Sequence, residues 1–325
     1  MKLASFEVPT AVGPARRIGV LEDETIVDIT ASYAAALDAD GVGGASDIAN
    51  AVTPPDMIEY LRRGDRARAA TREALSFVSE AEAQATFNGA QLRYRPDDIR
   101  LLAPVPRPNS IRDFMLFEEH VRNSLDGELP AVLQELPIYY KGNPDSVVGP
   151  GSEVEWPKYT EKLDYELELC AVIGKQGRDI PAAEAMDYVA GYTIFNDFSA
   201  RDIQMREMEG RLGPTKGKDF ANGFGPYLVT SDEIDIHDLD VRASVNGEVW
   251  SDGSTTEMIH SFPEIIEHVS QDETLYPGDV LGTGTVGNGC GLELDRWLER
   301  GDTVALEAEG IGTLEHHIVP NSSNT

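Results

Sequence analysis

The chain has 325 residues, of which 41% are hydrophobic and 26% charged, proportions that are typical of soluble globular proteins. Its 57 acidic and 27 basic residues give a formal net charge of −30 at pH 7, which argues against binding to nucleic acid or to anionic membranes. No apolar run is long enough to cross a membrane, and the N-terminal sequence lacks the apolar core of a signal peptide, so we expect a cytoplasmic protein.

Lysine is scarce, since only seven of the 27 basic residues are lysine and the others are arginine. An acidic, lysine-poor surface is typical of proteins from a high-salt cytoplasm, where salt screens the self-repulsion of the charges. We therefore expect a halophilic source, with an acidic protein from an ordinary organism as the alternative.

The two cysteines, Cys170 and Cys290, are too few to form a disulfide framework. Cys170 lies in an apolar run and is expected in the core, whereas Cys290 lies among glycines, which leave room for partial exposure. A catalytic role is disfavoured for both thiols, because no neighbour in sequence would obviously lower their pKa.

Residues 1–98 predict a smaller N-terminal α/β domain. The alternating segment 16–30 contains an acidic turn and predicts a β-hairpin. Residues 54–85 have helical spacing, with Pro55 near the start and Gly64 as a break. A proline-rich passage then joins this domain to residues 99–325.

Strand patterns dominate residues 99–325, and the helical patterns are short. They are centred on residues 113–124, 181–187, 197–208 and 262–270. Because the strands do not alternate regularly with helices, the predicted fold class is α+β and mostly β, with a rolled sheet of antiparallel or mixed strands.

Residues 162–169 predict a strand that carries carboxylates along one face, because alternate residues of a strand point the same way. Asp164, Glu166 and Glu168 share this face, and Asp197 ends an apolar strand about thirty residues later. If the face is wet, the row is an ordinary solvated surface. If it is buried, the carboxylates require protonation, basic partners or a bound cation. Three oxygen ligands would suit Mg²⁺, Ca²⁺ or Mn²⁺ rather than zinc.

Two further segments carry candidate catalytic groups. Residues 110–124 predict a short amphipathic helix in which His120 follows two glutamates, so His120 is either an ordinary surface histidine or, beside a metal site, a general base. Lys216 and Lys218 lie in a loop rich in glycine. They are either solvated lysines or charges that stabilise an anionic substrate or enolate.

Five motifs together resemble the fumarylacetoacetate hydrolase superfamily. They are "YYKGNPDSVVGPG" (139–151), "LDYELEL" (163–169), "GYTIFNDFSARDIQ" (191–204), "LGPTKGKDF" (212–220) and "YPGDVLGTGTVG" (276–287). The similarity extends from about Ser110 to Thr313, and residues 1–98 resemble the variable N-terminal domain of the longer members. The resemblance implies a mixed β-roll core, with short helices, in a catalytic domain of residues 99–325, and it implies a homodimer.

The resemblance also implies a set of site residues. Glu166, Glu168 and Asp197 would hold the divalent cation, usually Mg²⁺, with Asp113 as the additional ligand of longer members and Asp164 as a supporting residue. The carboxylate and carbonyl oxygens of a small keto-acid substrate would be bound by Tyr140, Arg201, Gln204, Lys218 and Thr285.

The activity that the resemblance implies is hydrolysis of a C–C bond in a 1,3-diketo acid of the fumarylacetoacetate or acylpyruvate type. His120, on a mobile lid, would take a proton from water, and the cation and Lys218 would stabilise the enolate that leaves. The alternatives are a lyase of the same family, namely a 2-keto-3-deoxy sugar acid dehydratase or a 2-oxo acid decarboxylase, and a non-catalytic binding module.

The sequence departs from the family pattern at the acid that partners the catalytic histidine. Short acylpyruvate-cleaving members have a glutamate three residues after the histidine, where this chain has Asn123, and the late loop 284–291 contains no acid. Glu119, or Glu118, is left as the candidate partner, although adjacent residues of a helix do not face each other.

Overall fold

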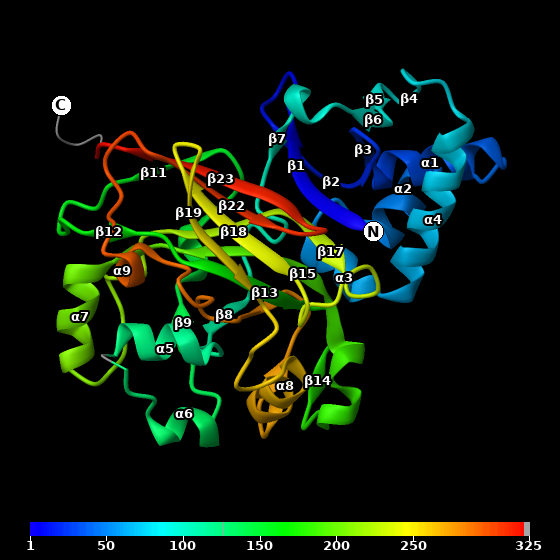
Figure 1. Ribbon diagram of the computed structural model, residues 1–325. Helices are drawn as coiled ribbons and strands as arrows, with labels where there is room; N and C mark the ends of the chain where they lie inside the picture. Colours follow the sequence, from blue (N-terminus) through cyan, green and yellow to red (C-terminus); the bar gives the residue numbers. More distant parts are fainter. Residues whose placement is uncertain (126, 322–325) are drawn as a thin grey trace.

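A large mixed sheet forms the centre of the computed structural model, which describes residues 1–125 and 127–321 (Figure 1). Its strands are β1 (Lys2–Val8), β2 (Ala15–Glu22), β3 (Thr25–Asp28), β6 (Arg93–Tyr94), β7 (Arg100–Leu101), β8 (Ser110–Asp113), β9 (Tyr140–Gly142), β10 (Val147–Val148), β13 (Leu167–Ile173), β15 (Val189–Asp197), β17 (Asn222–Thr230) and β21 (Asp279–Gly282). The order is β6-β3-β2-β1-β17-β15-β13-β21-β8-β9, with β10 beside β17 and β7 beside β1.

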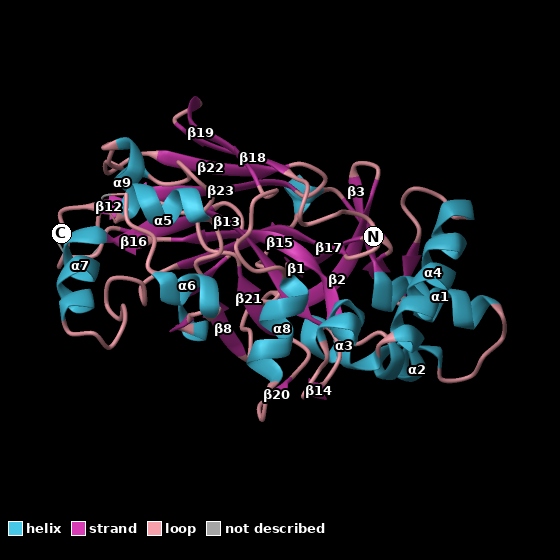
Figure 2. Ribbon diagram, turned by 60° about the horizontal axis from the view of Figure 1, so that its bottom comes forward, coloured by secondary structure: helices cyan, strands magenta, loops and turns pink. Residues whose placement is uncertain are grey.

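A second sheet covers one face of the first (Figure 2). It contains β11 (Ser152–Glu155), β18 (Asp240–Val245), β19 (Glu248–Ser254), β22 (Thr303–Ala308) and β23 (Gly312–Val319), in the order β11-β23-β22-β18-β19. Leu167 and Ile194 of the large sheet pack with Val241 and Leu306 of the second sheet in one buried cluster. Three short pairs complete the strands: β4 (Thr86–Phe87) with β5 (Ala90–Gln91), β12 (Leu163–Asp164) with β16 (Ser199–Ala200), and β14 (Gly177–Arg178) with β20 (Thr274–Leu275).

The helices gather at the two ends of the sheets (Figure 1). At one end lie α1 (Ile29–Ala39), α2 (Ala45–Val52), α3 (Met57–Arg63) and α4 (Asp65–Glu80), and toward the other lie α5 (Glu118–Ser124), α6 (Ala131–Glu135), α7 (Arg201–Glu209) and α9 (Gly291–Leu294). The others are α8 (Phe262–Ser270) and the 3₁₀ turns η1 (Pro96–Asp98), η2 (Pro144–Ser146) and η3 (Ala182–Tyr188). No helix among the described residues is both long and apolar enough to span a bilayer.

Most of the predicted elements are confirmed, and two helices begin later than predicted. The hairpin at 16–30 forms as β2 and β3, and Gly64 separates α3 from α4 as expected. The helix expected around 113–124 begins only at Glu118, because Ser110–Asp113 pairs with β21 and β9 as β8. Likewise, α7 begins at Arg201, after β16 has paired with β12.

The N-terminal strands extend the central sheet. Leu3 of β1 pairs with Leu228 of β17, and Ile18 of β2 shares a buried cluster with Val172 and Phe195 of the core strands. Residues 1–98 are therefore joined to the rest through one continuous sheet, and a domain boundary at residue 98 stays a prediction.

Asp28 is a buried carboxyl group at the junction of β3 and α1. Its Oδ1 accepts a hydrogen bond from the backbone N of Ala31 at 2.9 Å, which caps α1, and Arg17 Nε lies 3.7 Å from Oδ2. Burial outweighs both interactions and raises the pKa of Asp28 to about 6.

We predict that Asp28→Asn stabilises the protein increasingly as the pH rises. The raised pKa means that the contribution of wild-type Asp28 to stability is fully present below its unfolded pKa and is lost as the pH passes 6. Asn keeps the cap and cannot ionise. The free energy of urea unfolding of the variant, relative to wild type, should grow by about 1 kcal/mol or more between pH 5 and pH 8, since each pKa unit is worth about 1.4 kcal/mol. Asp23→Asn, in the exposed turn between β2 and β3, is the matched charge control, and a pH-independent effect of Asp28→Asn would contradict the prediction.

Candidate active site

A cavity of about 730 Å³ collects most of the predicted site residues at the end of the large sheet near α5 and α7. Nine of them line it: Asp113, His120, Tyr140, Glu166, Glu168, Arg201, Gln204, Lys218 and Thr285. Asp197 lies behind this lining, bonded to Lys218 and Tyr140, and Glu119 lies outside it. Residues from widely separated segments of the sequence therefore meet in one place.

The carboxylate row is buried, so the wet-surface interpretation is excluded. Glu166 and Glu168 are 4% and 1% exposed. Along β13, Leu167 and Leu169 face the core between the two sheets, and the alternate residue Cys170 packs on the opposite side, the face that Glu168 shares. Glu168 pairs with Phe195 of the neighbouring strand β15, and this register brings the end of β15, with Asp197, to the glutamates.

Three carboxyl groups form a cluster that fits a divalent cation. Asp113, Glu168 and Asp197 place oxygen atoms within 4.8 Å of one another, and all three residues are buried. Within the described part of the chain, Glu168 Oε2 and Asp197 Oδ1 have no hydrogen-bond partner. Buried oxygens without partners are costly, and an oxygen-only ligand set is the kind that Mg²⁺, Ca²⁺ and Mn²⁺ prefer.

The pKa shifts in this cluster have the same origin. Burial, and next the charge of Asp197, raise the pKa of Asp113, while burial and the charge of Asp113 raise that of Glu168. Burial also raises the pKa of Asp197 to about 6, although Lys218 opposes the shift. Burial and mutual repulsion therefore favour the protonated form of these carboxyls, and a bound dication would favour the ionised form.

Glu166, the remaining predicted ligand, is held by two cations. Its Oε2 bonds to Lys218 Nζ, and its Oε1 lies 2.8 Å from Arg201 Nη2. Burial opposes ionisation of Glu166, but Lys218 and Arg201 outweigh it and lower the pKa of this carboxyl. Glu166 therefore stands ionised beside the cluster, and its role as a fourth ligand stays a prediction.

The two lysines of the glycine-rich loop differ in environment. Lys218 is 3% exposed, and its Nζ donates to Asp197 Oδ2 at 2.5 Å. Burial favours the neutral amine, but Asp197 and Glu166 raise the pKa of Lys218 above its usual range, so it is a fixed ammonium group. Lys216 is exposed and lies over the Tyr159 ring. The solvated-lysine interpretation therefore holds for Lys216 alone.

The acid partner of His120 is Glu293. His120 Nδ1 and Glu293 Oε2 are 2.9 Å apart, and the two side chains are 8% and 0% exposed. Burial would raise the pKa of Glu293, but its hydrogen bond with His120 and the hydrogen bonds from Asn123 and Asn288 lower it. Sequence reasoning missed Glu293, whose only signal is an acid in the short segment just after loop 284–291.

Neither candidate from the helix itself meets His120. Glu119 accepts a hydrogen bond from Asn288 Nδ2 at 2.9 Å and packs against Gly287, while Glu118 pairs with Arg122 at 2.7 Å. Both glutamates therefore lie on other faces of α5, as the helical geometry requires.

The remaining predicted substrate-binding groups surround the cluster. Tyr140 donates to Asp197 Oδ2 at 2.5 Å, and Thr285 donates to Glu168 Oε1 at 3.1 Å. Arg201 Nε donates to Asp164 Oδ2 at 2.8 Å, which gives Asp164 the supporting role expected of it, and Arg201 Nη1 donates to Gln204 at 3.0 Å. Arg201 Nη2 is buried 2.8 Å from Glu166 Oε1, so this arginine pairs with two carboxylates beside the cavity that it lines.

The outer part of the cavity is apolar. Six of its lining residues are large, exposed hydrophobic residues: Met115, Leu125, Ile138, Met205, Met208 and Leu212. They come from the segments around α5, α6 and α7 and form an apolar rim around the charged floor of the cavity, which Glu166, Glu168, Arg201 and Lys218 line.

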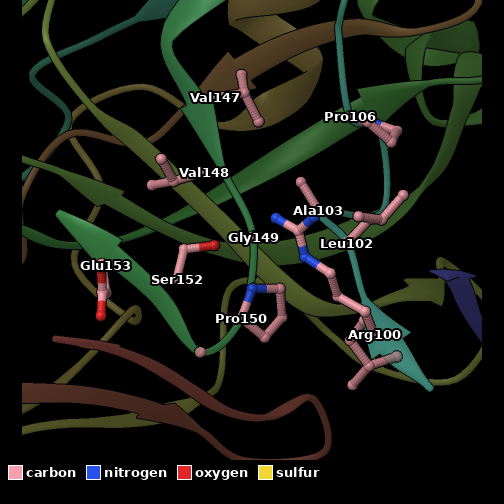
Figure 3. Close-up of a pocket in the computed structure, with 12 residues that line it drawn as sticks. Arg100, Leu102, Ala103, Pro106, Val147, Val148, Gly149, Pro150, Ser152 and Glu153 are labelled. Carbon is pink, nitrogen blue, oxygen red and sulfur yellow. The ribbon is translucent and has the colours of Figure 1, made fainter. Parts of the chain in front are cut away.

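A second cavity of about 630 Å³ has a different lining (Figure 3). It lies between β7, β10 and β11, and the side chain of Arg100 extends across it. Arg100 and Glu153 are its charged lining residues, and none of the predicted site residues lines it. The first cavity is therefore the candidate active site.

Comparison with known proteins gives consistent matches along the chain. A family model described as fumarylacetoacetate (FAA) hydrolase C-terminal matches residues 110–319. The chain is 34% identical to the human mitochondrial oxaloacetate tautomerase FAHD2A, over 98% of this chain and 92% of that protein. It is also 34% identical to the oxaloacetate tautomerase YisK of Bacillus subtilis, over 82% of this chain and 87% of that protein. A solved fumarylacetoacetate hydrolase from Exiguobacterium antarcticum is similar with a TM-score of 0.72 and 28% identity, over 98% and 100% of the two chains.

We predict that Glu168→Gln abolishes tight binding of a divalent cation and, without metal, leaves the protein at least as stable as wild type. The substitution removes one ligand and one of the crowded carboxyls together. Wild-type protein should be stabilised by about 2.7 kcal/mol at a cation concentration of 100 Kd, and the variant should gain almost nothing. Thermal unfolding with Mn²⁺ or EDTA, together with calorimetric titration, measures both effects. Glu161→Gln, at an exposed position, is the control, and unchanged cation binding by Glu168→Gln would refute the site.

Proposed function

The chain belongs to the fumarylacetoacetate hydrolase family, and on that basis we propose that it is a divalent-cation-dependent enzyme that interconverts the keto and enol forms of oxaloacetate or a closely related 2-oxo acid. The observation that carries the proposal is the His120–Glu293 pair beside a buried carboxylate cluster. The relatives named oxaloacetate tautomerases, which match over most of their length, support this reaction.

We assign substrate recognition to Arg201 and Lys218, the cationic side chains that line the inner part of the cavity. Arg201 lines the cavity with a guanidinium charge that suits a carboxylate, and Lys218 is a buried ammonium group that suits the oxygen on which negative charge develops. Gln204 and Thr285 add polar groups at the same end of the cavity.

The cation site completes the floor. Asp113, Glu168 and Asp197, with Glu166 beside them, would hold the cation, and Mg²⁺ is the proposed native ion with Ca²⁺ or Mn²⁺ as alternatives. When bound, the cation supplies positive charge that polarises the 2-oxo group of the substrate.

Proton transfer is assigned to His120. With Nδ1 protonated and donating to Glu293, the lone pair of Nε2 is free to accept a proton, which is the arrangement of a general base. His120 takes a proton from the carbon next to the oxo group, and Lys218 stabilises the enolate oxygen. That oxygen then takes a proton from solvent water to give the enol, and His120 releases the abstracted proton to solvent. The reverse sequence regenerates the keto acid.

Hydrolysis of a C–C bond in an acylpyruvate or fumarylacetoacetate-type acid is the second candidate, although the sequence by itself ranks it first. The same base would activate water, and the same floor would stabilise the enolate that leaves. The size of the cavity, about 730 Å³, favours a substrate larger than oxaloacetate. A lyase reaction has less support, because it does not require a histidine base paired with a glutamate.

The proposal also includes the oligomeric state, the substrate partner and the cellular location. We infer a homodimer from the family resemblance, a small keto acid as the partner, and a halophilic, cytoplasmic setting from composition alone.

The two candidate reactions give different products. We predict that Mg²⁺-loaded protein in high salt accelerates the decay of the enol absorbance of oxaloacetate without releasing pyruvate, and that EDTA abolishes the effect. Acetylpyruvate and fumarylpyruvate should be tested alongside, with pyruvate measured by a coupled assay. Pyruvate release from either acid, with no effect on oxaloacetate, would replace the tautomerase by the hydrolase.

Substitutions of His120 and Glu293 should separate the effect on catalysis from the effect on cation binding. His120→Ala should lower kcat by roughly 10²–10⁴-fold, the usual contribution of general base catalysis, and leave cation affinity unchanged. Glu293→Gln should lower kcat less, because it only weakens the orientation and polarisation of the imidazole. Steady-state kinetics and calorimetry measure the two properties.

Glu119→Gln is the matched control for Glu293→Gln, because Glu119 is adjacent to His120 in sequence but bonds elsewhere. Its kcat should stay close to wild type. An equal loss in both variants would show that the partner of His120 is misassigned.

A further inference from the structure

A second group of potential metal ligands lies beside the carboxylate cluster and has a different chemistry. His120, Cys290 and Glu293 place a nitrogen, a sulfur and an oxygen atom within 4.8 Å of one another. Cys290 Sγ is 3.3 Å from Glu293 Oε2, the oxygen that also bonds to His120 Nδ1. Cys290 is fully buried, although its glycine-rich sequence left room for exposure.

We propose that His120, Cys290 and Glu293 form a binding site for zinc or another thiophilic dication, and that its occupation inhibits the enzyme. Imidazole, thiolate and carboxylate are the ligands of zinc sites, whereas Mg²⁺ and Ca²⁺ are bound through oxygen. The active centre thus contains two neighbouring sites with opposite metal preferences.

Zinc binding would require only small rotations of the His120, Cys290 and Glu293 side chains. Zinc bonds of about 2.0–2.3 Å in a tetrahedron place the ligand atoms roughly 3.3–3.8 Å apart. The measured separations of 2.9 Å and 3.3 Å are close to this range, and the third is below 4.8 Å. Of the three ligands, His120 lines the cavity, and Cys290 and Glu293 lie outside that lining.

The backbone holds Cys290 and Glu293 in place. The backbones of Cys290 and Glu166 form an isolated antiparallel β-bridge. The backbone amides of Gly291 and Leu292 donate hydrogen bonds to the Asp164 carboxylate at 2.7 Å and 3.0 Å. The ligands therefore come from the fixed start of α9 and from the neighbouring helix α5. Such a preformed site limits the entropy cost of binding.

Occupation of this site would remove the general base. The dication takes the lone pair of His120 Nδ1, the ring proton then resides on Nε2, and that nitrogen no longer accepts a proton from substrate. Glu293 and the Cys290 sulfur become ligands, and the thiol proton leaves to solvent. The inhibitory part rests on the proposed function, whereas the binding part does not.

The competing explanation is that Cys290 is only a buried hydrogen-bond donor to Glu293. Cys290→Ser separates the two, because serine keeps a donor of similar size and lacks the soft sulfur ligand. Cys170→Ala is the matched control, since Cys170 is also buried but packs in a cluster with Val172 and Phe195.

The binding test uses the full chain saturated with Mg²⁺ and titrates zinc against a chromophoric chelator. We expect Cys290→Ser to weaken zinc binding by roughly 100-fold or more, since even indirect partners of a metal contribute 10–100-fold. Co²⁺ should produce a sulfur-to-metal charge-transfer band in wild type and in Cys170→Ala, and none in Cys290→Ser. Equal zinc affinity in wild type and Cys290→Ser, or a cobalt spectrum without the band, would overturn the site.

The activity test compares each variant with its own zinc-free rate. Zinc should inhibit wild type at saturating Mg²⁺, and Cys290→Ser should need at least about tenfold more zinc for the same fractional inhibition. Equal inhibition of both would assign the effect to the carboxylate cluster and reject the inhibitory role. Glu168→Gln, which lacks a cluster ligand, should keep the thiol-dependent zinc and cobalt signals, so the site is testable even if oxaloacetate is not the substrate.

Discussion

The constraint on which the rest of this structure depends is a surplus of buried negative charge. Asp113, Glu166, Glu168 and Asp197 converge at the end of the large sheet, and Lys218 and Arg201 are the cations that pair with them. Glu166 pairs with both cations. The charges of the other three carboxyls are less fully compensated, and their pKa values are raised. A bound dication would relieve the repulsion among these carboxyls, which supports the proposed cation site.

The fold makes this crowding possible by using glycine where the strands approach the carboxyls. Gly282 on β21 pairs with Asp113 on β8, and a Cβ at Gly282 would collide with Asp113 Oδ1. Gly284 has a φ of +75°, and a Cβ there would collide with the carbonyl oxygen of Phe114. The loop after β21 can therefore pass close to the cluster and deliver Thr285 to Glu168. In physical terms, the glycines of this motif allow the backbone to approach the cluster closely.

The sequence predicts those parts of the site that depend on local periodicity, and it misses those that depend on pairing across the chain. Alternation along residues 162–169 suffices to put Glu166 and Glu168 on one face. The partner of His120 is 173 residues away, so helical position near His120 suggested Glu119, and only the packing of α9 on α5 reveals Glu293. For the same reason the hairpin at 16–30 is predicted from its alternation, but β1 and its pairing with β17 are not.

The outer cavity, rather than the floor, decides between the candidate reactions. Head-group recognition, charge stabilisation and the His120–Glu293 base are identical for proton abstraction from carbon and for activation of water. The difference is whether water stands between His120 and the substrate. The apolar rim, which includes Met115, Met205 and Met208, is exposed to solvent, so a small 2-oxo acid on the floor would leave it uncovered. A longer acyl chain would fill that rim and leave space for water only next to His120, so the chemistry follows from what occupies the rim.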